Sequence, residues 1–254
     1  MTTLTTIDVA QATGKPILEF GQAWMVSPAT AARAAELELV ASGRFGFWVS
    51  GRAGVLGDVD PSVAASALGF MAPSAVREYW SVRPASLSAW DAALAWFGCA
   101  ATWGRNALTV MPEADVRRLA DLARKVIDHA DLSIGTLFAG STLIPLPGDA
   151  AGDATINLNV LRELRGGAHL AACHAAGLGP HATIMSTDDP VRAGSAWAEG
   201  FGWRAPHPTP DPEARVRVEE LTTIATARSF EPLEPAERAD FVELVAAARA
   251  CLTD

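Results

Sequence analysis

The sequence predicts an all-α fold, a multi-helix globule of about ten helices. A serine or aspartate stands directly before a proline at four places, which is the pairing preferred at the N-cap and first turn of a helix. Strand patterns are weak, since even the best aromatic run lies between helix-forming segments and a glycine. The four N-cap pairs are Ser27-Pro28, Asp60-Pro61, Asp189-Pro190 and Asp211-Pro212.

The elements follow in chain order. Residues 44–51 are aromatic, and we expect a short connecting helix or turn there. The glycine-rich segment 51–58 is predicted to be a turn that joins helices. Residues 85–106 are predicted to form a helix of small and aromatic residues, and 112–131 the clearest amphipathic helix, with an apolar stripe opposite a charged face. Residues 136–150 are predicted to be a loop, because prolines and a glycine interrupt them.

A weak internal similarity divides the chain into two helical halves. Residues 34–70 and 169–201 show the same order of helix, glycine turn, Asp-Pro and helix. We therefore predict an N-terminal half at 1–110 and a C-terminal half at 111–254, which together can form one globule. A groove between two such halves is a natural place for a ligand pocket.

Composition narrows the class of protein. The chain has 254 residues, of which half are hydrophobic and 19% charged, so it can bury a large core. The net charge of −9 disfavours binding to nucleic acid or to an anionic membrane. Three dispersed cysteines, no apolar run long enough to span a bilayer and no signal-peptide pattern lead us to expect a cytoplasmic protein.

The stretch RELRGGAH, residues 162–169, has two adjacent glycines inside a helix predicted at 156–176. Each glycine costs about 1 kcal/mol relative to alanine there. Either a neighbouring helix packs closely, or the helix breaks and exposes backbone N–H groups beside two guanidinium groups as an anion site. Arg162, Arg165 and His169 share one helix face. In the structural alternative, Arg165 and His169 only tie helices together through carboxylates and carbonyls.

Three further residues are candidate ligand contacts. Arg52 stands near Phe47 and Trp48, so its guanidinium group can stack on a ring or face a ligand. Trp96 and Trp103 share a helix face around small residues, which suits the wall of a site for a flat or apolar ligand. Core packing is the alternative, since buried tryptophans are more often used that way.

The sequence has no motif for a metal site, a phosphate loop, a dinucleotide site or a catalytic nucleophile. His169 and His174 are about 140° apart around a helix and cannot chelate one metal ion together. The segment 51–58 lacks the spacing of a phosphate loop, and dinucleotide fingerprints and nucleophile motifs are absent. We expect no metal site and no cofactor.

Two segments resemble a known family. The run FWVSGRAGVLGDVDPSVAASALGFMAPSAVREYW and the segment Arg165-Gly166-Gly167-Ala168-His169 are similar to actinobacterial all-helical proteins grouped as a helix-turn-helix family. The resemblance covers roughly residues 15–250 and implies an all-helical fold. The family pattern has Arg-Gly-Asp-x-His, so Gly167 replaces its aspartate. The family's winged-helix-like C-terminal region looks shortened, with little room for a recognition helix at 203–221.

The function predicted from these features is small-molecule binding. The protein could be a tailoring or isomerising enzyme of specialised metabolism that acts on an anionic, partly apolar ligand. Arg52, Arg162 and Arg165 would bind the anion, Trp96 and Trp103 the apolar part, and His169 would carry the proton. A ligand-responsive transcriptional regulator and a metabolite-sequestering self-resistance protein are the alternatives. The sequence leaves open whether the protein forms a homodimer.

Overall fold

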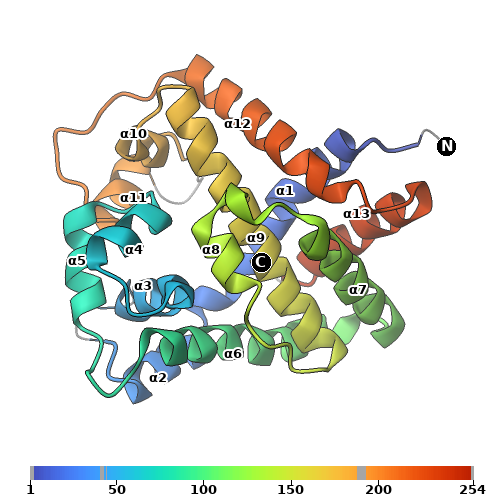
Figure 1. Cartoon of the computed structure of the whole chain (residues 1–254), viewed down its shortest axis with the longest axis horizontal. Helices are drawn as coiled ribbons and strands as arrows, with labels where there is room; N and C mark the ends of the chain where they lie inside the picture. The colour runs from blue at the N-terminus through green and yellow to red at the C-terminus, as the bar shows by residue number, and fades with distance from the viewer. Residues whose placement is uncertain (1–2, 41–42, 44, 188–192, 253–254) are drawn as a thin grey trace.

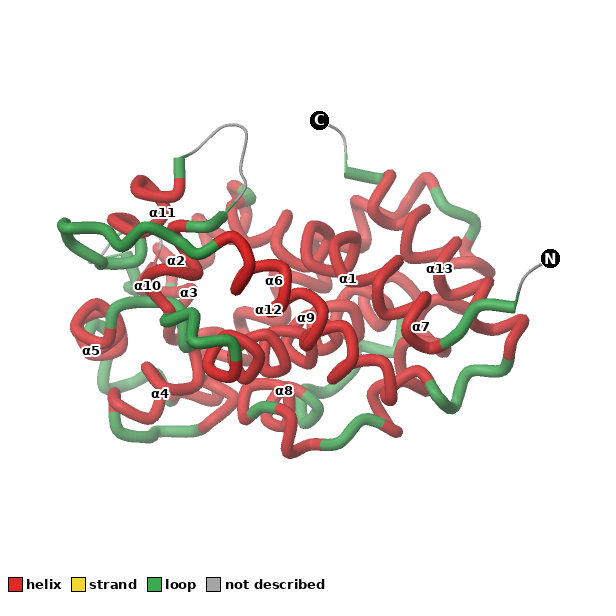
Figure 2. Tube along the Cα trace, turned by 90° about the horizontal axis from the view of Figure 1, so that it is seen from above, coloured by secondary structure: helices red, strands yellow, loops and turns green. Residues whose placement is uncertain are grey.

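The computed structural model describes residues 3–40, 43, 45–187 and 193–252. Within these residues the chain forms α-helices and short 3-10 helices and has no strand, so the predicted all-α class is confirmed (Figures 1 and 2). The helices are α1 (Thr6–Ala23), α2 (Pro28–Glu36), α3 (Phe45–Ala53), α4 (Pro61–Leu68), α5 (Pro73–Ser81), α6 (Ala89–Ala107), α7 (Glu113–His129), α8 (Thr136–Ser141), α9 (Ala150–Ala175), α10 (Pro180–Met185), α11 (Gly194–Gly200), α12 (Pro212–Ala227) and α13 (Pro235–Ala250). The 3-10 helices are Trp24–Val26, Gly54–Leu56, Leu108–Val110, Leu132–Ile134 and Arg228–Phe230.

The predicted N-caps explain where several helices begin. The side chains of Ser27, Asp60 and Asp211 accept hydrogen bonds from backbone N–H groups of α2, α4 and α12, and a proline occupies the first turn of each helix. These bonds satisfy donors that have no partner inside the helix. The fourth pair, Asp189-Pro190, lies outside the described residues.

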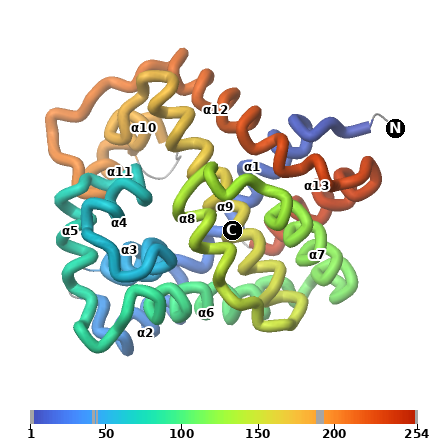
Figure 3. Tube along the Cα trace, viewed as in Figure 1, coloured from blue at the N-terminus to red at the C-terminus, as the bar shows by residue number. Residues whose placement is uncertain are grey.

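Helix α9 is the centre of the molecule (Figure 3). It packs against α1, α6, α7, α8 and α12, and residues of its first half are buried on all sides. Polar side chains there make hydrogen bonds across helices: Asn157 donates to the carbonyl of Ala120, and Asn159 accepts from the indole N–H of Trp24 at 3.2 Å, while Oδ1 of Asn157 has no partner among the described residues. A helix buried all round is expected to have such pairs, because an unpaired buried polar group is destabilising.

One large hydrophobic cluster spans both predicted halves of the chain. It includes Phe20 and Trp96 from the first half and Leu122, Leu158 and Phe241 from the second. The division into halves at 1–110 and 111–254 stays a prediction. Because the two halves share this core, they would form one globule and not two separate domains.

Two predictions on the connecting segments need correction. Residues 136–150 are not wholly a loop, because Thr136–Ser141 forms α8 and only the stretch after it is irregular. Residues 203–221 do have room for a helix, since α12 begins at Pro212. Both predictions relied on prolines and glycines, which mark helix ends but do not exclude a helix a few residues away.

Candidate functional site

One face of α9 forms the wall of a cavity of about 350 Å³. Six residues of α9 line it, and they recur every three or four residues, which places them on one helical stripe. The opposite walls come from Arg52 of α3, the end of α4 up to Phe70, and residues 134–138 at the start of α8. The α9 residues are Glu163, Gly166, Gly167, Leu170, Ala171 and His174.

The two glycines of α9 have different surroundings. The helix runs through them without a break, so the exposed-backbone alternative is wrong at this site. A Cβ on Gly167 would lie 2.5 Å from the carbonyl oxygen of Ile134 and 3.0 Å from the Cα of Gly135, so Gly167 lets this segment pack directly on the helix. A Cβ on Gly166 would have no atom closer than 3.9 Å. The close-packing alternative therefore holds for Gly167 alone.

A buried charge cluster borders the cavity through two of its three members, Arg52 and Glu163. Arg52 donates from Nε and Nη2 to the two carboxylate oxygens of Glu163, at 2.7 and 2.8 Å. Arg162 donates from Nη1 to Oε1 of the same carboxylate at 2.9 Å. The three side chains are at least 89% buried, with exposed fractions of 10% for Arg52, 11% for Arg162 and 5% for Glu163. Two positive groups thus share one negative group.

Burial and charge set the ionisation of this cluster. Burial lowers the pKa of Arg162 to about 10, and the positive charge of Arg52 adds to that effect. Burial by itself would raise the pKa of Glu163, but the charges and hydrogen bonds of Arg52 and Arg162 outweigh it and hold this pKa below its ordinary value. All three groups are charged at neutral pH, and the cluster has a net charge of +1. The Nε atom of Arg162 is buried and has no hydrogen-bond partner among the described residues.

Arg52 has one edge left for a ligand. Glu163 occupies the Nε–Nη2 edge of its guanidinium group, and Trp48 stacks on it with 4.8 Å from Cζ to the ring centroid. A guanidinium group has five N–H donors. The Nη1–Nη2 edge has no acceptor among the described residues of the protein, and Arg52 lines the cavity. That edge has the spacing that binds a carboxylate through two parallel hydrogen bonds.

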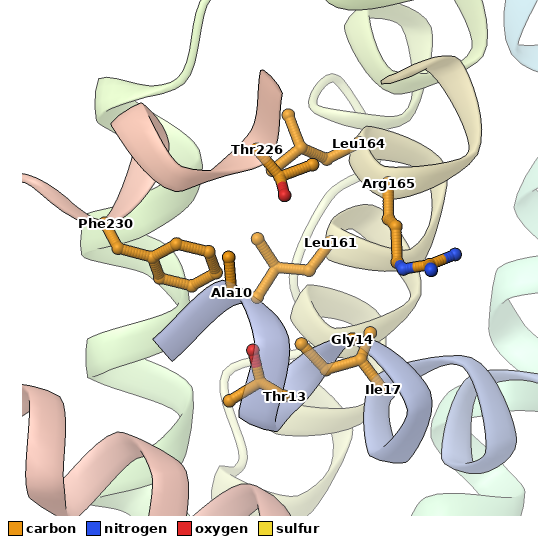
Figure 4. Close-up of a pocket in the computed structure, with 9 residues that line it drawn as sticks. All are labelled: Ala10, Thr13, Gly14, Ile17, Leu161, Leu164, Arg165, Thr226 and Phe230. Carbon is orange, nitrogen blue, oxygen red and sulfur yellow. The ribbon is translucent and has the colours of Figure 1, made fainter. Parts of the chain in front are cut away.

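The predicted stripe of Arg162, Arg165 and His169 exists, but it faces α1 and α12. Arg165 pairs with Glu219 of α12 at 2.6 Å and packs beside Gly14 of α1. It also borders a second cavity of about 20 Å³, where its guanidinium group points away from Phe230 (Figure 4). That space is large enough for about one water molecule.

His169 lies behind the wall of the larger cavity. Its Nδ1 is 3.1 Å from Oγ1 of Thr222, whose own hydroxyl donates to the carbonyl of Val218, so Nδ1–H is the donor. Burial, opposed by Glu219 and reinforced by Arg165, lowers the pKa of His169 to about 4. The imidazole is therefore neutral at pH 7. Its ring centroid is 5.7 Å from that of Phe70, which lines the cavity.

Both predicted tryptophans pack against other aromatic residues. Trp96 is 2% exposed and contacts the rings of Trp24 and Phe47, with centroid distances of 4.4 and 5.0 Å. Trp103 makes an edge contact with Phe20 at 5.2 Å. Neither tryptophan is among the residues lining the two cavities. This placement matches the core-packing alternative, while a role in ligand binding has not been tested.

Glu163 and His174 line the cavity but were not predicted as site residues from the sequence. Both lie in or near the RELRGGAH stretch, and they share a stripe with Gly166, Gly167 and Leu170. The periodicity of that stripe was a usable signal. The basic residues lie on a different stripe of the same helix, so charge alone does not predict the stripe that lines the cavity.

The rest of the described chain adds two negative observations. No group of three or more His, Cys, Asp or Glu residues in it is arranged to hold a metal ion. No helix in the same residues has the length and apolar character needed to cross a membrane.

The fold and the site define an all-α protein with a cavity beside its central helix and a positively charged cluster that borders that cavity. A family model described as a helix-turn-helix family matches residues 11–209. The match covers most of the chain, so the protein belongs to this helix-turn-helix family. Comparison with curated proteins and with solved structures gave no significant match.

Proposed function

We propose that this protein binds a small organic carboxylate in the cavity beside α9. The observation that carries the proposal is Arg52, which lines the cavity and whose Nη1–Nη2 edge has no acceptor among the described residues. A planar carboxylate matches that edge in shape and charge.

The charge of the cluster supports an anionic ligand. Arg52, Arg162 and Glu163 are buried with a net charge of +1, and an uncompensated buried charge is destabilising. A ligand carboxylate on Arg52 would make the site neutral. Glu163 then acts as a positioning residue, since it holds the guanidinium group on one edge and directs the other edge to the ligand.

The remaining walls support a partly apolar ligand of limited size. Phe70, Leu137, Phe138 and Leu170 line the cavity together with Arg52 and Glu163. Its volume of about 350 Å³ is near the lower end of the range for small-molecule sites, which is about 300–1,000 Å³. A carboxylate with one or two rings, or a short alkyl chain, fits this description.

Turnover of the ligand remains a separate proposal. His174 lines the cavity and is exposed, so it is the imidazole best placed to exchange a proton with a ligand there. His169, the proton carrier predicted from sequence, lies on the other side of α9 and its role is untested. A tailoring or isomerising enzyme of specialised metabolism would use this proton transfer, whereas a sequestering protein would not. The cytoplasmic location and the homodimer also stay predictions.

The test compares a carboxylate with its neutral amide. We expect 2-naphthoate to bind the protein and 2-naphthamide to bind at least ~10-fold more weakly, because the amide lacks the charge that pairs with Arg52. Isothermal titration calorimetry at pH 7 measures both. Arg52→Gln should weaken naphthoate binding by roughly 10- to 100-fold, and it should thereby remove the preference for naphthoate over naphthamide.

Arg165→Gln is the matched control, because it removes another ion-paired arginine, one that lies on the face of α9 away from the cavity. It should leave naphthoate binding unchanged. Because Arg52→Gln leaves Glu163 buried with one partner fewer, Arg52→Lys is measured as well; it keeps the charge but not the two-donor edge. Equal binding of naphthoate and naphthamide by the unmodified protein, or no binding of naphthoate at millimolar concentration, contradicts the proposal.

A ligand-responsive transcriptional regulator is the second candidate, and the family description favours it. Helix α12 supplies a helix in the region where a recognition helix was not expected. However, the most basic run of the chain, on α7, is paired with carboxylates: Arg117 with Asp153, Arg118 with Asp240, Arg124 with Asp128 and Lys125 with Glu237. Paired cations attract phosphate weakly, so we rank this candidate below ligand binding.

A further inference from the structure

Gly166 has no structural reason to be a glycine. It lies in the interior of α9, and it is not among the described glycines with a positive φ angle. The nearest atoms to a Cβ built on it are 3.9 Å away, which leaves room for a methyl group. Alanine would make the helix more stable at such a position. The glycine therefore lowers helix stability without any gain in packing or turn geometry.

The space in front of Gly166 lies beside the charged cluster. The two atoms nearest to its Cβ position are Nη2 of Arg52 and Oε2 of Glu163. Gly166 also lines the 350 Å³ cavity. A side chain at this position would therefore extend into the cavity beside Nη2 of Arg52, the nitrogen that belongs both to the edge occupied by Glu163 and to the edge assigned to the ligand carboxylate.

We infer that Gly166 determines specificity by letting the carbon skeleton of the ligand lie directly against the α9 backbone, with its carboxylate on Arg52. This inference rests on the proposed function and adds the place and orientation of the ligand. A ring attached to the carboxylate is the group most sensitive to this space, because its first atoms must pass over Gly166 to reach Arg52. The ligand class is an aryl or similarly bulky carboxylate.

Two other glycines serve as controls. Gly98 of α6 is also in a helix interior, is exposed and has nothing within 4 Å of a Cβ, but it is not among the residues lining the cavity. Gly167, in contrast, is packed against the backbone of Ile134. Gly98→Ala thus reproduces the effect of a methyl group on an open helix, without the site.

The experiment measures 2-naphthoate affinity by calorimetry and the melting temperature of Gly166→Ala, Gly166→Leu and Gly98→Ala. Both alanine variants should melt at the same temperature as the unmodified protein or a few degrees higher. Gly166→Ala should bind naphthoate at least ~5-fold more weakly and Gly166→Leu at least ~50-fold, because added atoms occupy the ligand's place. Gly98→Ala should bind it with unchanged affinity.

The outcomes separate this inference from the proposed function. If the unmodified protein binds naphthoate, Arg52→Gln weakens it and Gly166→Leu does not, the ligand site stands and the role of Gly166 is wrong. If Gly166→Ala melts at a lower temperature, the glycine is needed for packing and the inference is overturned. If the unmodified protein does not bind naphthoate, both proposals fail. Weaker binding with unchanged or higher stability supports both.

Discussion

At the scale of single residues, the same helix carries two arginines with different surroundings. Arg162 and Arg165 are three residues apart, yet Arg162 joins the buried cluster with Glu163 while Arg165 pairs with the half-exposed Glu219. The sequence analysis predicted that both bind an anion. Arg165 meets a carboxylate supplied by α12, whereas Arg162 pairs with its own chain neighbour Glu163, which Arg52 of α3 also binds.

The buried imidazole of His169 should make stability depend on pH. Burial lowers its pKa from the ordinary 6.5 to about 4, with Arg165 adding to the effect. Between pH 6.5 and pH 4 the unfolded chain takes up a proton at this residue and the folded chain does not. The free energy of unfolding therefore falls as pH falls through this window, by up to roughly 3 kcal/mol from this residue.

Urea unfolding at several pH values between 7.5 and 4 measures this effect. His169→Gln should have a shallower dependence on pH in that range, since it removes the group that the folded state keeps neutral. His129→Gln is the control, because His129 is exposed. A pH dependence in His169→Gln equal to that of the unmodified protein would contradict the assignment.

At the scale of elements, the contact between α9 and the segment before α8 depends on Gly167. A Cβ there would lie 2.5 Å from the Ile134 carbonyl oxygen, so α9 and this segment would have to move apart. We expect Gly167→Ala to lower the free energy of unfolding by about 1–3 kcal/mol.

Chemical denaturation of Gly167→Ala and Gly166→Ala tests this difference between adjacent positions. Gly166→Ala should be as stable as the unmodified protein or more stable by up to about 1 kcal/mol. Equal effects of the two substitutions would show that the close contact at Gly167 is not what limits the side chain there.

The elements themselves were largely predictable. The predicted helix at 112–131 corresponds to α7, and the predicted helix at 85–106 to α6, with small shifts at the ends. These helices carry a clear 3.6-residue pattern or a capping residue, both of which are local signals. Helix α8 was missed because six residues are too few to show a periodicity. The start of α9 was placed late because its first turns are buried on all sides and have no polar face.

At the scale of the whole molecule, the net charge of −9 predicts that the protein attracts DNA only weakly. We expect no sequence-selective complex with genomic DNA fragments in a mobility-shift assay at low salt, because the basic run of α7 is neutralised by Asp and Glu side chains. A basic helix-turn-helix protein is the positive control. Selective binding would place the regulator ahead of the small-molecule proposal, and addition of 2-naphthoate would then show whether the cavity controls it.

The sequence by itself determined the all-α class and the starts of α2, α4 and α12, and it pointed to the RELRGGAH stretch. These follow from capping, periodicity and composition, which act over a few residues. Only the tertiary structure decided that Arg52 meets Glu163 across 111 positions of the chain, and that the cavity lies on the Glu163–His174 stripe of α9. The physical reason is that a helix presents several faces of similar polarity, and only packing against other helices determines which face is sealed and which one borders a cavity.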